Sequence, residues 1–224
     1  MEIKKQNNIL NDVYTRLPNG IIKQQDNKIT MDYGKEYITG RYDTSFIPKE
    51  ILTKMAGLRL GYLLGSIKED IGSILDVGYG GGDFLNICTE RGLDSYGIDV
   101  PGVSLPKGAK EGNLENYYDI VCFFDSLEHF PDIDFVRNLK CKYVCISVPW
   151  CHFCSKKDLG EEWFSEWKHR RYGEHLWHFD DKSLENFLNE CGFKVISKSN
   201  IEDTIRKNSD SLENILTIVG AKEK

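Results

Sequence analysis

Residues 73–100 constrain the fold more than any other part of the chain. They read SILDVGYGGGDFLNICTERGLDSYGIDV. The apolar residues 73–77 predict a buried strand, and the glycine-rich residues 78–82 follow at once, where the backbone can take positive φ. Residues 83–91 carry apolar side chains at helical spacing, and residues 95–98 predict a second strand. The stretch therefore predicts strand, tight turn, helix and strand, with a turn backbone that a ligand can approach closely.

Two glycine patterns compete for this turn. The dinucleotide fingerprint GxGxxG needs a glycine three places after its second one, and counting from Gly80 that place is held by Asp83. The dehydrogenase pattern therefore fails. A different pattern has an acid two places before the first glycine, here Asp76, and a second acid at the end of the next strand, here Asp99. These residues resemble motif I and the second-strand acid of class I S-adenosylmethionine (SAM) dependent methyltransferases.

That resemblance implies a fold and a cofactor. The fold class is α/β, a Rossmann-like sandwich on a seven-stranded sheet that is mostly parallel and carries an antiparallel C-terminal edge hairpin. The cofactor is SAM, with Asp76 near the methionine ammonium. Asp99 would accept hydrogen bonds from both ribose hydroxyls, which suits a carboxylate because the ionised group only accepts. The loop that passes under the amino acid and ribose would be formed by Gly78, Tyr79, Gly80 and Gly82.

The chain departs from the family average after this unit. Residues 101–108, PGVSLPKG, hold two prolines and two glycines, so we expect a loop in place of the usual second crossover helix. Asn113 stands where the family often has a residue that contacts the adenine amino group. A surface loop residue needs no such role, and both interpretations stay open.

Residues 118–124 predict a buried strand, and the segment DSLEH follows it. By resemblance this segment lies nearest the sulfonium and the acceptor, which makes Asp125 a cofactor contact and His129 a candidate base. In the ubiquinone-pathway O-methyltransferases an acid-x-x-Glu-His pattern at this place holds a divalent metal, and Asp125, Glu128 and His129 match it. Many relatives carry the same Leu-Glu-His without a metal, so we assign none.

Residues 150–181 are the most individual part of the chain, because they hold its tryptophans and every histidine except His129. By resemblance, an insertion after the fifth strand forms the acceptor pocket. Its segment around His175 and His178 resembles one that lines the active site in small-molecule methyltransferases. These two histidines and His129 are therefore the candidate bases, since an imidazole can take a proton near pH 7.

Zinc is an alternative for the same insertion. Cys151 and Cys154 form a CxxC pair, and His175 with His178 supplies two more ligands of the right kind. The His-x-x-His spacing matches the metal-free family segment better. The seven cysteines are an odd number and lie mostly in apolar runs, so we expect buried free thiols.

Residues 1–46 are polar and show no sustained period, so we treat them as an N-terminal arm before a methyltransferase domain over residues 47–224. Residues 28–31 are predicted to pair with residues 21–24 as a small hairpin. A tyrosine-rich segment that includes Tyr42 resembles the lid that closes over the cofactor in many small-molecule methyltransferases. Packing of these tyrosines on the domain is the alternative.

Composition narrows the class of partner. The net charge is −6, so the average surface does not attract nucleic acid or an anionic membrane. No apolar run approaches the length that spans a bilayer, and the N-terminus lacks the apolar segment of a signal peptide. These features predict a soluble, cytoplasmic protein with no membrane partner, and the resemblance to small-molecule methyltransferases implies a small-molecule acceptor as its partner. The oligomeric state stays open.

The predicted activity is methyl transfer from SAM to an oxygen or nitrogen, less readily a carbon, of a small or medium-sized acceptor. One alternative is an RNA-modifying methyltransferase that docks its substrate on the basic aromatic segment Lys168 to Arg171. Another is a SAM-binding protein without catalysis, because the turn and its two acids indicate cofactor binding and do not by themselves indicate methyl transfer.

Overall fold

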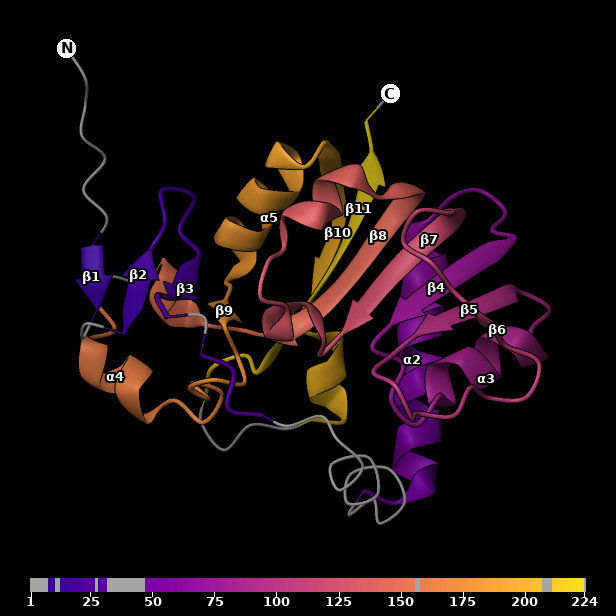
Figure 1. Cartoon of the computed structure of the whole chain (residues 1–224), viewed down its shortest axis with the longest axis horizontal. Helices are drawn as coiled ribbons and strands as arrows, with labels where there is room; N and C mark the ends of the chain where they lie inside the picture. The colour runs from indigo at the N-terminus through magenta and orange to yellow at the C-terminus, as the bar shows by residue number, and fades with distance from the viewer. Residues whose placement is uncertain are drawn as a thin grey trace.

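A seven-stranded sheet forms the centre of the computed structural model, which describes residues 8–10, 13–26, 28–31, 47–155, 158–206 and 211–223 (Figure 1). The strand order is β10-β11-β8-β7-β4-β5-β6. The parallel strands are β4 (Ser73–Val77), β5 (Asp94–Ile98), β6 (Lys110–Glu111), β7 (Tyr117–Phe124) and β8 (Lys140–Pro149). Strand β11 (Ile215–Lys222) runs antiparallel to β8 and to the edge strand β10 (Phe193–Ser199). The predicted mostly parallel sheet with an antiparallel C-terminal hairpin is confirmed.

The strand sequences match their places in the sheet. Central strand β7 reads YYDIVCFF and is buried from its fourth residue onward, as expected for a parallel strand with helices on both faces. Edge strand β10 reads FKVISKS, and along its length more exposed residues alternate with less exposed ones, the period of two that indicates one solvated face.

Helices cover both faces of the sheet (Figure 1). Helices α2 (Lys49–Ser66) and α3 (Asp83–Glu90) pack on one face, against a cluster that includes Ile74, Ile120 and Cys122. Helix α5 (Asp181–Glu190) packs on the other face, against Val121, Val144 and Leu216. The shorter helices are η2 (Leu127–His129), η3 (Asp134–Asn138), η4 (His152–Cys154), α4 (Glu161–Glu166) and η5 (Ile201–Thr204). Between β5 and β6 the chain forms the expected loop and no helix.

A second, small sheet joins the N-terminal segment to the insertion. Its order is β1 (Asn8–Leu10), β2 (Tyr14–Arg16), β3 (Ile22–Gln24) and β9 (Trp177–His178), with antiparallel pairs throughout. The segment over residues 13–26 is therefore packed against residues of the 150–181 insertion. Within the described part of the chain, no helix is both long enough and apolar enough to span a bilayer.

The predicted hairpin between residues 21–24 and 28–31 is wrong. Strand β3 pairs with β2 across the turn at residues 17–21, where Leu17 N donates to Ile21 O at 2.7 Å and Gly20 takes φ 96°. The Pro-Asn-Gly sequence is a stronger turn signal than Gln-Asp-Asn, because glycine takes positive φ without a steric cost. Residues 28–31 are not in a strand.

Candidate active site

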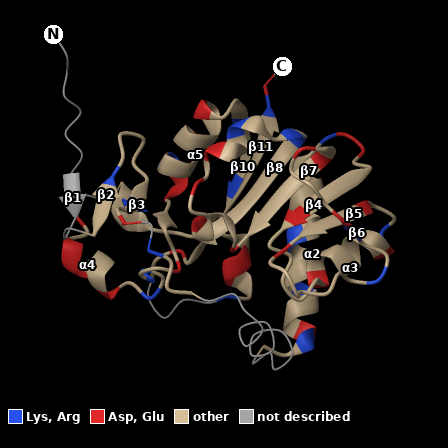
Figure 2. Ribbon diagram, in the orientation of Figure 1, with Lys and Arg blue, Asp and Glu red and all other residues tan. Residues whose placement is uncertain are grey.

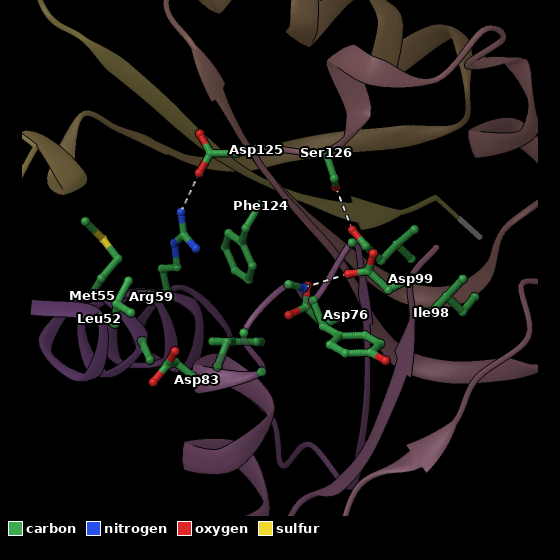
Figure 3. A pocket seen from close by; sticks show the side chains of 18 of the residues that line it. Leu52, Met55, Arg59, Asp76, Asp83, Ile98, Asp99, Phe124, Asp125 and Ser126 are labelled. Carbon is green, nitrogen blue, oxygen red and sulfur yellow. Dashed lines mark hydrogen bonds and ion pairs between the residues drawn. The ribbon is translucent and has the colours of Figure 1, made fainter. Parts of the chain in front are cut away.

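A cavity of about 1080 Å³ opens at the carboxyl ends of β4, β5 and β7 (Figure 3). Its walls come from the glycine turn, the end of β5, the segment after β7 and the first half of α2. The strand order reverses between β4 and β7, and ligands bind at such reversals in open α/β sheets. The cavity is large enough for a small organic ligand.

The glycine turn needs its glycines. Gly78, Gly80 and Gly82 have φ of 84°, 55° and 73°, which disfavours side chains. A Cβ on Gly78 would lie 2.6 Å from the Ser126 Cβ, and one on Gly82 would lie 2.2 Å from Pro106. At these two glycines the turn therefore brings backbone close to Ser126 after β7 and to Pro106 in the loop after β5.

Asp99 lies at the end of β5 and lines the cavity. Its Oδ2 accepts a hydrogen bond from Gly80 N at 2.6 Å, and its Oδ1 accepts one from Val100 N at 2.7 Å. Each carboxylate oxygen has two lone pairs, so both oxygens keep acceptor capacity after these bonds. The backbone thus fixes a carboxylate that can receive two hydroxyl donors.

Asp76 has a different environment. It is buried in β4, and its Oδ1 has no hydrogen-bond partner among the described residues. Burial raises the pKa of its carboxyl to about 7, with Arg59 opposing the shift and Asp99 adding to it. A cationic ligand group beside it would favour the ionised form.

Asp125 is held by two arginines from distant parts of the chain. Arg59 Nη2 lies 2.9 Å from its Oδ2, and Arg206 Nη1 lies 2.8 and 2.7 Å from its two oxygens (Figure 3 shows Arg59). The buried Glu202 balances the second positive charge. Burial opposes ionisation of Asp125, but the arginines outweigh it and hold its pKa well below its usual range. The Asp125 backbone has φ 52°, in the left-handed region that residues other than glycine seldom adopt.

Sequence reasoning missed Arg59 and Arg206. Arg59 had a usable signal, because it is a lone charge within the apolar run MAGLRLGYLL and so calls for a buried partner. No sequence feature marked Arg206, because it lies in a polar segment and is 81 residues from Asp125.

One of the three candidate bases lines the cavity, and it is His129. His175 and His178 are buried behind it, with the His175 ring centroid 4.8 Å from that of His129. Burial, with neighbouring His129, lowers the pKa of His175 to about 2, and burial with Arg170 lowers that of His178 to about 3. Both are therefore neutral near pH 7 and lie outside the cavity lining.

The four residues of the zinc alternative do not come together as a ligand group among the described residues. Within the described ranges, one group of three His, Cys, Asp or Glu side chains has ligand atoms within 4.8 Å of one another, and it is Glu128, His129 and His175. Cys151 and Cys154 pack in an apolar cluster with Phe164. All seven cysteines are free and buried, as predicted.

The remaining predicted cofactor contacts are Tyr79, Asn113 and Tyr42. Tyr79 lines the cavity, and its hydroxyl donates to Val103 O at 2.9 Å. Asn113 is not among the lining residues, and its Oδ1 accepts from Glu115 N at 2.8 Å. Tyr42 lies outside the described residues, so its lid role stays a prediction. None of the described residues of the insertion is among the lining residues either.

The basic segment Lys168 to Arg171 does not form one exposed face. His169 is buried, and the Arg170 guanidinium lies 5.1 Å from the Tyr14 ring centroid. Arg171 pairs with Glu174 at 2.9 Å. Figure 2 shows basic and acidic residues interspersed over the described ribbon, which gives RNA docking no support from charge.

Comparisons with known proteins agree with this geometry. The magnesium protoporphyrin IX methyltransferase of Synechocystis PCC 6803, solved with bound SAH, has 15% identity over 84% of this chain and 92% of its own, with a TM-score of 0.51. The plantazolicin methyltransferase BpumL, solved with a triazolic desmethylPZN analog and SAH, has 14% identity over 86% of this chain and 92% of its own, with a TM-score of 0.54. A SAM-dependent methyltransferase from Clostridium acetobutylicum has 9% identity over 84% and 97%, with a TM-score of 0.51.

At these identities the solved structures establish the fold. No curated protein matches the sequence. The family model described as a methyltransferase domain matches residues 49–198, which is more than half of the chain and includes the glycine turn, Asp99 and the segment after β7. The chain therefore belongs to the methyltransferase domain family, as its resemblance to class I SAM-dependent methyltransferases predicted.

Proposed function

We propose that this protein binds SAM in the cavity and transfers its methyl group to an oxygen or nitrogen of a small or medium-sized acceptor. The observation that carries the proposal is the Asp99 carboxylate, oriented by two backbone N–H groups toward a cavity that begins at the glycine turn. A vicinal ribose diol offers the two donors that such a carboxylate can accept.

The remaining cofactor contacts follow from charge. Asp76 would lie beside the methionine ammonium, where a cation favours its ionised form. Helix α3 begins at Gly82 with no side-chain cap, so its first backbone N–H groups are available to an acceptor group of a ligand. Asp125, with its charge already balanced by Arg59 and Arg206, would shape the wall near the sulfonium.

Methyl transfer needs little covalent chemistry from the protein. The sulfonium makes the methyl group electrophilic, so the enzyme must hold donor and nucleophile in line and exclude water. A base is needed only for an acceptor that is protonated at neutral pH, and His129 is the predicted candidate that lines the cavity.

The nature of the lining supports an organic acceptor. Apolar side chains from Ile47, Leu52, Met55 and Phe130 lie among the lining residues. Two solved proteins of the same fold are named for the methylation of a porphyrin and of plantazolicin. Both observations favour a medium-sized acceptor with an apolar body.

The test is calorimetric titration with SAM and S-adenosylhomocysteine, using NAD as a ligand control. We expect micromolar binding of both sulfur ligands, no binding of NAD, and at least tenfold weaker binding in Asp99→Ala, a loss of about 1.4 kcal/mol. Asp94→Ala is the matched control, since Asp94 lies on the same strand with its side chain 63% exposed.

Binding by the control should stay within twofold of wild type. No binding of either sulfur ligand to the wild-type protein would contradict the proposal. SAM binding without S-adenosylhomocysteine production from any acceptor pool would instead favour the non-catalytic alternative.

A further inference from the structure

Glu128 is a buried acid that the proposed cofactor site does not use. It follows β7 in helix η2 and is 1% exposed. Neither of its carboxylate oxygens has a hydrogen-bond partner among the described residues. A buried carboxyl group without a partner costs roughly 1–3 kcal/mol or more, so its position calls for a ligand or a proton.

Two histidines lie beside it. Ligand atoms of Glu128, His129 and His175 lie within 4.8 Å of one another. His175 is 5% exposed, and its Nδ1 also has no hydrogen-bond partner in the described part of the chain. Three ligand-bearing side chains, two of them buried with unpartnered atoms, therefore converge on one place.

The imidazole of His129 is oriented for this arrangement. Its Nδ1 lies 2.9 Å from the Glu174 carbonyl oxygen, which can only accept. Nδ1 therefore carries the proton, and Nε2 carries the lone pair of the neutral ring. A ligand histidine that donates its other ring N–H to a backbone carbonyl is a usual feature of metal sites.

Hydrogen bonds hold the two contributing segments in register. Leu176 N donates to Glu128 O at 2.8 Å, and Trp177 Nε1 donates to Phe130 O at 2.7 Å. Together with the His129 bond they join η2 to the end of the insertion at three points. The geometry is thus set by the backbone as well as by the side chains.

We propose that Glu128, His129 and His175 bind a divalent transition-metal ion such as Zn²⁺, Mn²⁺ or Fe²⁺. Two imidazoles and one carboxylate suit these ions, whereas Mg²⁺ and Ca²⁺ prefer ligand sets made of oxygen. This ligand set differs from the acid-x-x-Glu-His pattern of the sequence in one member. Asp125 is paired with Arg59 and Arg206, and His175 is the third side chain beside Glu128 and His129.

The ion would stand at the wall of the cavity, because His129 lines it. Three protein ligands leave coordination positions for water or for an oxygen of the acceptor. His129 cannot hold an ion and take a proton on the same Nε2, so the metal replaces it as the group that activates an acceptor hydroxyl. This consequence rests on the proposed function, while the metal site itself does not.

The experiment uses the full chain, stripped of metal by dialysis against a chelator, and Co²⁺ as the probe. We expect one equivalent of Co²⁺ bound with visible ligand-field absorption, and competition by Zn²⁺ in equilibrium dialysis. Glu128→Gln and His175→Gln should each weaken Co²⁺ binding at least thirtyfold. Loss of a group that only hydrogen-bonds a metal ligand typically weakens metal binding by about 10–100-fold, and these two residues are proposed as ligands themselves. A cooperative thermal unfolding transition, measured without metal, serves as the check that each variant is folded.

His169→Gln is the matched control, since His169 is a buried histidine of the same insertion that bonds Asn214 instead. It should bind Co²⁺ within threefold of wild type. Asp125→Asn should likewise retain Co²⁺, because its carboxylate lies outside the set. The proposal is overturned by substoichiometric Co²⁺ in the wild-type protein, or by binding that Asp125→Asn abolishes and His175→Gln preserves. Binding of S-adenosylhomocysteine is measured separately, so failure of the metal site and failure of the proposed function are distinguishable.

Discussion

Asp76 and Asp99 are two carboxylates at neighbouring strand ends, and their surroundings prepare them for different partners. Asp99 receives two backbone N–H groups and is half-buried. Asp76 is buried, and one of its oxygens has no donor among the described residues. The first environment suits neutral hydroxyl donors, and the second suits a cation that arrives with the ligand.

The raised pKa of Asp76 makes the ligand-free protein sensitive to pH. Its pKa of about 7 in the folded chain lies above the ordinary carboxyl value of 3.8, so the folded state binds more protons between these limits. Stability is therefore lost as the pH rises from about 4 to about 7, by an amount on the order of 4 kcal/mol at 1.36 kcal/mol per pKa unit.

Asp76→Asn should remove this loss. In urea unfolding without ligand, the free energy of unfolding of the variant minus that of wild type should increase from pH 4 to 7 and stay constant above pH 7. A difference between the two proteins that stays constant over that range would show that Asp76 does not titrate there.

At the scale of elements, two helices begin in opposite ways. Helix α5 has a full capping box. Ser183 N donates to Asp180 Oδ1 at 2.8 Å, and Asp180 N donates to the Ser183 hydroxyl oxygen at 2.9 Å. Helix α3, at the cavity, begins on a glycine without a side-chain cap. The first arrangement satisfies the helix N-terminus internally, and the second leaves backbone donors for a ligand.

Removal of the cap should therefore destabilise the fold. Asp180→Ala is expected to lower the free energy of unfolding by about 1–2 kcal/mol. Asp181→Ala, one residue later and partly exposed, should change it by less than about 0.5 kcal/mol. Equal effects of the two substitutions would argue against a specific contribution of the capping box.

At the scale of the whole molecule, the small sheet connects the N-terminal segment to the insertion, which in turn bonds the segment after β7. Strand β9 pairs with β3, and the residue before it bonds the backbone of Glu128. Ile22 is fully buried in the apolar cluster of this sheet, with Cys151, Phe153 and Phe164. The N-terminal strands and the insertion should therefore unfold together with the large sheet.

Ile22→Ala tests this connection. Loss of a buried isoleucine should cost about 2–5 kcal/mol, and unfolding should remain a single transition. Tryptophan fluorescence reports the insertion and far-UV circular dichroism reports the whole chain, so their midpoints should coincide. Ile196→Ala on β10 is the control, because Ile196 is 42% exposed. A separate early fluorescence transition in Ile22→Ala would show that the small sheet unfolds independently.

The sequence alone determined the central unit and the family. The strand, glycine turn, helix and strand over residues 73–100 depend on local periodicity and on the positive φ that glycine permits. The loop after Asp99 followed from its two prolines and two glycines. Such features are properties of short segments, so they can be read without knowing what those segments contact.

The tertiary structure decided which distant side chains meet. Asp125 is neutralised by arginines 66 and 81 residues away, and His175 replaces it beside Glu128 and His129. The insertion packs on the N-terminal strands, and its described residues do not line the cavity. These outcomes depend on which surfaces come together when the elements pack, and burial then sets the charge of each group. No local pattern encodes that partnership, because its free energy arises only when the folded chain removes both partners from water.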